Sequence, residues 1–331
     1  MPTRILVTQH IPDEGLALLR AAGDATVDIN PTPGAIWTPE ELRAHVPGHD
    51  YLLCLLTDRI DAALLEAGAQ GTPPLRLVAN MAVGYNNIDL DAARRLGILV
   101  TNTPGVLTDA TADFTLALLL AVARRIPEAD RFTRAGRFTG WQPLLLLGAE
   151  LSGKTLGIVG MGRIGLAVAR RALGFGMSIV YTARHQLPAE EERALSASFA
   201  PLEDVLRRAD FLLLHVPYTA QTHHLLNAET LALLKPSAYV INTARGPIVE
   251  EAALVAALQA GRLRGAALDV FEEEPRIHPA LLQMEQVVLA PHIASATQET
   301  RALMATTAAR NILAHLRGET PPNLVVYSGD F

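Results

Sequence analysis

Three polar residues, Arg245, Glu274 and His292, each come shortly after an apolar stretch typical of a buried strand. A protonated imidazole can pass a proton to an oxygen on which negative charge develops. A neighbouring carboxylate orients that imidazole and favours its protonated form, and a guanidinium holds a carboxylate or carbonyl at two points. Each residue alone also fits an ordinary surface or capping role. Together they predict acid catalysis on a small anionic substrate, with no need for a metal ion.

A glycine-rich turn with GxGxxG spacing comprises Gly160, Met161, Gly162, Arg163, Ile164 and Gly165. An apolar strand is predicted before it at 155–159 and a helix after it at 164–173. Glycines at these positions permit a tight turn, close approach of a pyrophosphate and tight packing of the helix on the strand. The helix N-terminus then offers N–H groups to the phosphates. The turn therefore predicts a dinucleotide site.

The end of the next strand indicates which dinucleotide is preferred. An acidic residue about 20 positions after the turn normally binds the adenosine ribose of NAD. Here Thr182 takes that position, followed by Ala183 and Arg184. Because arginine pairs with a 2′-phosphate that a carboxylate would repel, we expect NADP(H) to be preferred, with NAD(H) also usable. The alternative is a solvated surface arginine and mixed cofactor use.

Short apolar runs alternate with amphipathic segments along the whole chain, which is typical of parallel sheets covered by helices. A turn-rich break falls at 101–105, after which Asp109 is predicted to cap a long helix through Arg125. The segment 295–317 reads as another long helix, placed to cross back to the first half. We therefore expect one discontinuous domain into which a second domain is inserted.

Composition excludes several classes of protein. The 331 residues suggest two domains, and 50% hydrophobic with 19% charged residues excludes disorder as the main state. A net charge of −6 argues against a nucleic-acid partner. No apolar stretch is long enough for a membrane span and no signal peptide is evident, so a cytoplasmic location is expected. The single cysteine, Cys54, forms no internal disulfide or cysteine-based zinc site.

Over essentially its whole length the chain resembles the D-2-hydroxyacid dehydrogenase family, and within it the glyoxylate/hydroxypyruvate reductases. The segments that carry the resemblance are 78–93, 101–120, 151–165, 242–254, 265–275 and 289–297. The family implies an α/β fold of two Rossmann-like domains with parallel sheets. The nucleotide-binding domain (104–296) would be inserted into a discontinuous, flavodoxin-like substrate domain (1–103 and 297–331).

The resemblance also implies roles for individual residues. Arg245 would bind substrate beside the nicotinamide, and Glu274 would be the partner of His292, the proton donor. The backbone at Val83 and Gly84 would meet the substrate carboxylate. The other residues implied near the nicotinamide are Thr243, Ala244 and Ala294.

The implied reaction is NAD(P)H-dependent reduction of glyoxylate, hydroxypyruvate or a related 2-oxo acid to the D-2-hydroxy acid. Another family activity, of the phosphoglycerate or D-lactate type, is an alternative. So is a non-enzymatic dinucleotide sensor that binds other proteins. A homodimer is expected from the apolar stretch 141–148. Trp141 would either enter a neighbouring subunit's site or pin its own loop.

Overall fold

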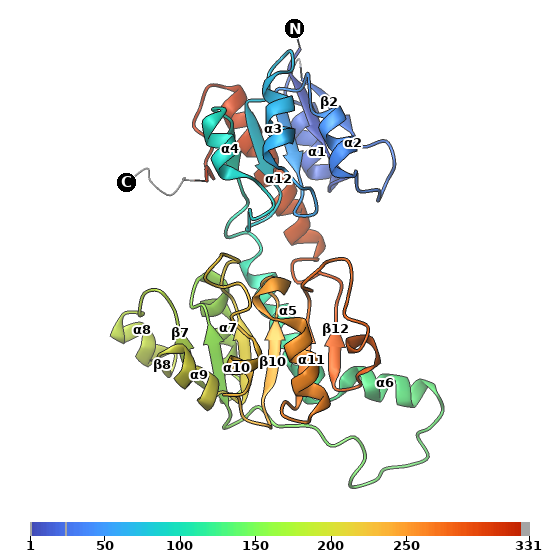
Figure 1. The fold of residues 1–331 in the computed structure, drawn as a ribbon, viewed down its shortest axis with the longest axis vertical. Coiled ribbons are helices and arrows are strands. Elements are labelled where there is room, and N and C mark those ends of the chain that lie inside the picture. Colours follow the sequence, from blue (N-terminus) through green and yellow to red (C-terminus); the bar gives the residue numbers. More distant parts are fainter. Residues whose placement is uncertain (1, 24, 326–331) are drawn as a thin grey trace. The chain divides into compact units, whose positions relative to one another are not determined.

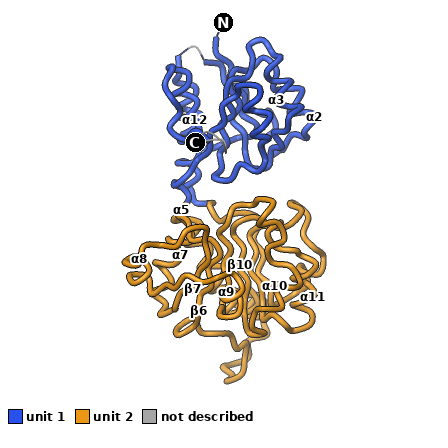
Figure 2. The backbone as a smooth tube through the Cα atoms, turned by 60° about the vertical axis from the view of Figure 1, so that its left-hand side comes forward, with its two compact units in different colours: residues 1–107, 296–331 blue, residues 108–295 orange. Residues whose placement is uncertain are grey.

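The computed structural model describes residues 2–23 and 25–325. The chain divides into two compact units, residues 1–107 with 296–331 and residues 108–295 (Figure 2). The first unit is discontinuous in sequence, and the second is a single continuous segment. Both units are built from parallel strands and helices that alternate along the chain, which is the predicted α/β class.

The first unit is built on a five-stranded parallel sheet with the order β2-β1-β3-β4-β5, the flavodoxin-like order. Its strands are β1 (Arg4–Val7), β2 (Thr26–Ile29), β3 (Tyr51–Cys54), β4 (Leu77–Asn80) and β5 (Leu99–Thr101). The central strands β3 and β4 are buried along their whole length, as expected for strands covered by helices on both faces.

Five helices belong to this unit within the described residues. They are α1 (Asp13–Arg20), α2 (Pro39–His45), α3 (Ala62–Ala69), α4 (Leu90–Arg95) and α12 (Gln298–Leu316). The C-terminal α12 packs against α1 and against the sheet (Figure 1). Tyr51 of β3 and His315 of α12 are joined by a 3.0 Å hydrogen bond between the phenol oxygen and Nδ1. The last helix is therefore an integral part of the first unit.

The second unit is built on a seven-stranded parallel sheet with the order β12-β11-β10-β9-β6-β7-β8. Its strands are β6 (Thr155–Val159), β7 (Ser178–Thr182), β8 (Ala197–Phe199), β9 (Phe211–Leu214), β10 (Tyr239–Asn242), β11 (Gly265–Leu268) and β12 (Val287–Leu289). The chain runs outward from β6 through β7 to β8 and then returns to β9 on the other side of β6. A sheet of this kind binds ligands at the carboxyl ends of its strands, at the point where the order reverses.

Helices cover both faces of this sheet (Figure 1). The helices of this unit are α5 (Thr108–Ala123), α6 (Ile126–Arg134), α7 (Arg163–Leu173), α8 (Ala189–Ala194), α9 (Leu202–Arg208), α10 (Ala228–Leu231) and α11 (Glu251–Gln259), and short 3₁₀ turns lie at Gly246–Ile248 and Leu281–Gln283. Alternate residues of β9 enter two different cores. Leu212 and Leu214 pack in the core that includes α9 and α11, and Leu213 packs in the core that includes α5 and α7.

Two local predictions are wrong. Asp109 does not cap the long helix, because α5 already begins at Thr108 and Asp109 lies in its first turn. The helix also ends at Ala123, since Arg125 adopts a left-handed backbone with φ 54° and a second helix, α6, follows. The edge strands β2 and β8 were not predicted, because neither is a continuous buried apolar run.

Among the described residues, no helix is both long enough and apolar enough to cross a membrane.

Candidate functional site

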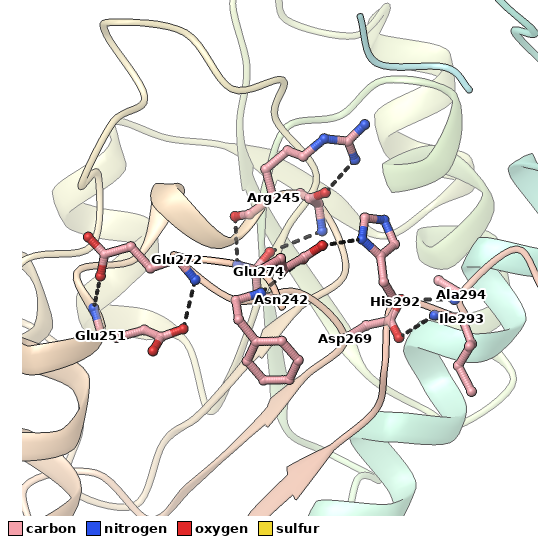
Figure 3. A network of polar contacts seen from close by, with 11 residues as sticks. Asn242, Arg245, Glu251, Asp269, Glu272, Glu274, His292, Ile293 and Ala294 are labelled. Atoms are coloured by element: carbon pink, nitrogen blue, oxygen red, sulfur yellow. Dashed lines mark hydrogen bonds and ion pairs between the residues drawn. The ribbon is translucent and has the colours of Figure 1, made fainter. Parts of the chain in front are cut away.

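The parallel sheet of the second unit places the three predicted catalytic residues on one side, beyond the carboxyl ends of its strands. Arg245 follows β10, Glu274 follows β11 and His292 follows β12, and these three strands are neighbours. The geometry brings Glu274 and His292 together, with Nδ1 of the imidazole 2.9 Å from Oε2 of the carboxylate (Figure 3). A carboxylate on Nδ1 holds the ring and leaves Nε2 to exchange a proton with a substrate.

The Glu274 carboxylate is held in its charged form. Partial burial raises its pKa, but the hydrogen bond and charge of His292, the Phe271 N–H at 3.1 Å and the charge of Arg245 outweigh burial. The net result is a pKa below the ordinary value. Glu274 is therefore an acceptor that remains ionised next to the imidazole.

Arg245 is half-buried in the turn after β10. The side chain of Asn242 shapes this turn, because it donates to the Arg245 carbonyl at 2.9 Å and accepts from the Ala244 N–H at 3.0 Å. Burial lowers the pKa of the guanidinium, an effect that the nearby charge of Glu274 partly offsets. Because arginine keeps its charge in proteins, this is a partly desolvated cation suited to a small anion.

Thr243, at the start of the same turn, is anchored to the helix layer. Its hydroxyl lies 2.8 Å from the hydroxyl of Thr115 in α5, and both groups are buried. The turn that carries Arg245 is thus tied to its own strand by Asn242 and to α5 by Thr243.

Asp269 is not among the residues predicted from the sequence, yet it holds the segment that carries His292. It is fully buried, and its two carboxylate oxygens accept the N–H groups of Ile293 at 2.7 Å and Ala294 at 2.8 Å (Figure 3). Its carbonyl accepts the N–H of His292 at 2.8 Å. His292 has a left-handed backbone with φ 56°, which is uncommon outside glycine, and these three bonds hold it there. An aspartate directly after a buried strand was the available signal.

The glycine-rich turn has the shape needed to receive a phosphate. A Cβ on Gly165 would lie 2.2 Å from the Gly160 carbonyl oxygen, so only glycine lets α7 start this close to β6. A Cβ on Gly162, in contrast, would meet nothing within 4 Å. Gly162 is the N-cap of α7 and supplies no side-chain acceptor for the first helical N–H groups. The turn therefore presents open space at a helix N-terminus, and these residues fit a dinucleotide pyrophosphate.

Thr182, Ala183 and Arg184 lie beside this turn. Thr182 pairs with Val159 at the carboxyl ends of β7 and β6, and its carbonyl accepts the Gly160 N–H at 2.9 Å. Thr182 and Ala183 are half-buried, whereas Arg184 is exposed. An uncharged strand end followed by an exposed cation is what the sequence indicated at this position.

In the first unit, the loop after β4 has its carbonyl groups fixed. The Ala82 carbonyl accepts the Thr103 N–H at 2.9 Å, and the Val83 carbonyl accepts the Asn102 amide at 2.8 Å. The Gly84 carbonyl accepts the amide of buried Asn80 at 2.8 Å. In a trans peptide the N–H points away from the carbonyl. The N–H group of the residue after each fixed carbonyl therefore faces the opposite side of the loop. The loop is thus arranged to offer main-chain donors.

Within residues 2–23 and 25–325, no three histidine, cysteine, aspartate or glutamate side chains are placed to hold a metal ion.

Comparison with known proteins agrees with this geometry. Residues 116–294 match the family described as D-isomer specific 2-hydroxyacid dehydrogenase, NAD binding domain. A glyoxylate reductase of Aeropyrum pernix is 51% identical, over 97% of this chain and 95% of its own length. A glyoxylate reductase of Thermococcus litoralis is 47% identical, over 98% of this chain and 97% of its own length. An NADPH-dependent glyoxylate/hydroxypyruvate reductase from Sinorhizobium meliloti, solved with NADP and malonate, is 36% identical with a TM-score of 0.86, over 98% of this chain and 97% of its own. The chain is therefore an oxidoreductase that belongs to the D-isomer specific 2-hydroxyacid dehydrogenase family.

Proposed function

We propose that this enzyme reduces glyoxylate, hydroxypyruvate and similar small 2-oxo acids to D-2-hydroxy acids with a nicotinamide coenzyme. The observation that carries the proposal is the bonded His292–Glu274 pair, which lies on the same side of the sheet as Arg245 and the glycine-rich turn. The glyoxylate reductases that share 47% and 51% of their residues with this chain support this substrate class over the phosphoglycerate and D-lactate alternatives.

In this proposal each residue has one task. A bound reduced nicotinamide supplies a hydride to the carbonyl carbon of the 2-oxo acid. His292 donates its Nε2 proton to the carbonyl oxygen as negative charge develops there, and Glu274 stabilises the imidazolium and fixes the ring. Arg245 binds the anionic substrate and opposes the developing charge. The chain thus aligns the substrate and neutralises the developing negative charge, while the coenzyme carries the redox chemistry.

The substrate carboxylate is assigned to the main-chain N–H groups around Val83 and Gly84. The fixed carbonyls of this loop support the assignment, because an anchored turn needs no reordering when an anion binds. The residues proposed to contact the nicotinamide are Thr243, Ala244, Arg245, His292 and Ala294.

The expected coenzyme is NADP(H), with Arg184 binding the 2′-phosphate and the glycine-rich turn binding the pyrophosphate. The exposed guanidinium of Arg184 and the lack of a carboxylate at Thr182 support this preference. Steady-state kinetics with both coenzymes tests it. Arg184→Ala should raise KM for NADPH about tenfold and leave KM for NADH unchanged, since one charge-assisted contact is lost. A wild-type kcat/KM with NADH that equals or exceeds the value with NADPH would refute the preference.

A homodimer is proposed from the apolar segment around Trp141. The side chains of Phe138, Trp141, Leu144 and Leu147 are 59, 83, 78 and 53% exposed, which is unusual for large apolar groups on a solvated surface. Such exposure fits a segment that packs against a second copy, and it does not fit a tryptophan that pins its own loop. Sedimentation at micromolar concentration should give a dimer, and Trp141→Ala should weaken it. A wild-type monomer would contradict this.

The cytoplasmic location stays a prediction from the sequence.

A screen of glyoxylate, hydroxypyruvate, pyruvate and phosphohydroxypyruvate tests the proposed reaction. The first two should give the highest kcat/KM. His292→Ala should lower kcat at least 100-fold while coenzyme binding, followed by fluorescence, stays intact, since general acid catalysis contributes about 10²–10⁴-fold. An effect of only a few fold would mean that His292 is not the proton donor. A protein that binds coenzyme but reduces none of the four acids would instead support a dinucleotide sensor.

A further inference from the structure

His224 lies outside the catalytic set but bonds to the loop that carries Glu274. It lies in the segment between β9 and α10, and its Nε2 is 2.5 Å from Oε1 of Glu272, two residues before Glu274. Both side chains are mostly buried, with 30 and 26% of their area exposed. His224 also has a left-handed backbone with φ 48°. An uncommon backbone conformation at a residue with a short, sheltered hydrogen bond indicates that the surrounding structure over-determines its position.

Glu272 is fixed by a second partner. Its Oε2 accepts the Glu251 N–H at 2.9 Å, while its own N–H donates to Oε1 of Glu251 at 2.7 Å (Figure 3). The other oxygen of Glu251 accepts the N–H of His278 at 3.2 Å. One carboxylate oxygen of Glu272 therefore bonds to the start of α11, and the other bonds to His224. Without His224, the second oxygen would lose its partner.

The same residue reaches the turn that carries Arg245. The N–H of His224 donates to the carbonyl of Pro247 at 2.9 Å. Gly246, between Arg245 and Pro247, lies so close to the loop that a Cβ there would be 1.9 Å from the carbonyl carbon of Phe271. The turn that carries Arg245 and the loop that carries Glu274 thus pack directly on each other, and His224 bonds to both.

We propose that His224 is a positioning residue for the reduction. Through Glu272 it fixes the segment 271–274, and thereby the Glu274 carboxylate that orients His292. The inference rests on the catalytic roles proposed above for Glu274 and His292. It assigns no contact between His224 and the substrate or coenzyme.

The rival interpretation is that His224 only supports its own loop. Its ring stacks on His223 with centroids 3.9 Å apart, and Nδ1 of His223 lies 3.3 Å from the Tyr218 hydroxyl. In that case, loss of the imidazole would lower stability without changing the catalytic pair.

The key variant is His224→Asn. Asparagine tolerates the left-handed backbone, but its short side chain does not reach Glu272. We expect kcat for 2-oxo acid reduction to fall about tenfold, with KM for the coenzyme changed by less than twofold, because a misplaced catalytic group costs rate. The matched control is Glu273→Gln, which alters the neighbouring carboxylate, paired only on the surface with Arg276, and should leave kcat unchanged.

A double-mutant cycle tests whether the effect passes through Glu272. Because His224 and Glu272 act in series, His224→Asn combined with Glu272→Ala should lower kcat no further than Glu272→Ala alone. Multiplied effects of the two substitutions would overturn the proposal.

A measurement without substrate or coenzyme separates this proposal from the proposed function. In protein with ¹⁵N-labelled histidine, the Nδ1 proton of His292 bonded to Glu274 should give a resolved signal, assigned by its loss in His292→Ala. His224→Asn should broaden or shift that signal, whereas Glu273→Gln should not. An unchanged His292 signal in folded His224→Asn would refute the positioning role, whatever the enzyme reduces. A changed signal in a protein that reduces no 2-oxo acid would uphold the positioning of Glu274 by His224 and refute only the proposed function.

Discussion

Gly246 is the position at which a single added carbon should do most damage to the proposed site. A Cβ there would lie 1.7 Å from the carbonyl oxygen of Phe271. Since a carbon–oxygen contact is normally about 3.3 Å, the Phe271–Glu272 peptide would have to retreat by about 1.6 Å in Gly246→Ala. That peptide leads into Glu274, and the Phe271 N–H bonds to the Glu274 carboxylate. The substitution therefore moves the catalytic carboxylate as well as the turn behind Arg245.

Both activity and stability should respond. A displacement of about 1 Å costs about 100-fold in rate, so kcat/KM for glyoxylate should fall at least that much. Overpacking against backbone should lower the free energy of unfolding by about 3 kcal/mol, measured by urea titration followed by fluorescence. Gly174→Ala is the matched control in the same unit, because its Cβ would lie 3.3 Å from the Arg171 carbonyl oxygen, a tight contact that a shift of a few tenths of an ångström relieves. A Gly246→Ala enzyme with wild-type kinetics and stability would refute the close packing of these loops.

Two further substitutions test how the pair is held. Asp269→Asn should lower the free energy of unfolding by about 2 kcal/mol, since the N–H groups of Ile293 and Ala294 would share one uncharged acceptor oxygen and one of them would face the amide NH2. It should also lower kcat, because the segment that follows His292 is held less firmly. Equal urea midpoints would contradict this. Glu274→Gln should show a pH-dependent difference in stability. The pKa of Glu274 is lowered in the folded protein, so its contribution is present above its ordinary value of 4.5 and disappears as the pH falls through the lower folded value. The difference in free energy of unfolding between wild type and variant, measured by urea titration, should narrow below pH 4.5. A difference that widens would refute the assignment.

The sequence alone was enough to predict the α/β class and the family, and both predictions are confirmed. Two kinds of local signal made this possible. The glycine spacing between β6 and α7 reflects a backbone requirement that few other residues meet. The polar residues Arg245 and His292 follow apolar strands, and the carboxyl ends of parallel strands meet on the same side of a sheet.

The tertiary structure decided which side chains are joined on that side of the sheet. Asp269, His224 and Glu272 carry no pattern in the sequence that reveals their partners, because each bond links segments at least 20 residues apart. The edge strands β2 and β8 escaped prediction because strand pairing, rather than continuous burial, defines them. Local composition thus specified the elements and the chemistry, whereas packing specified how the Glu274 and His292 loops are held.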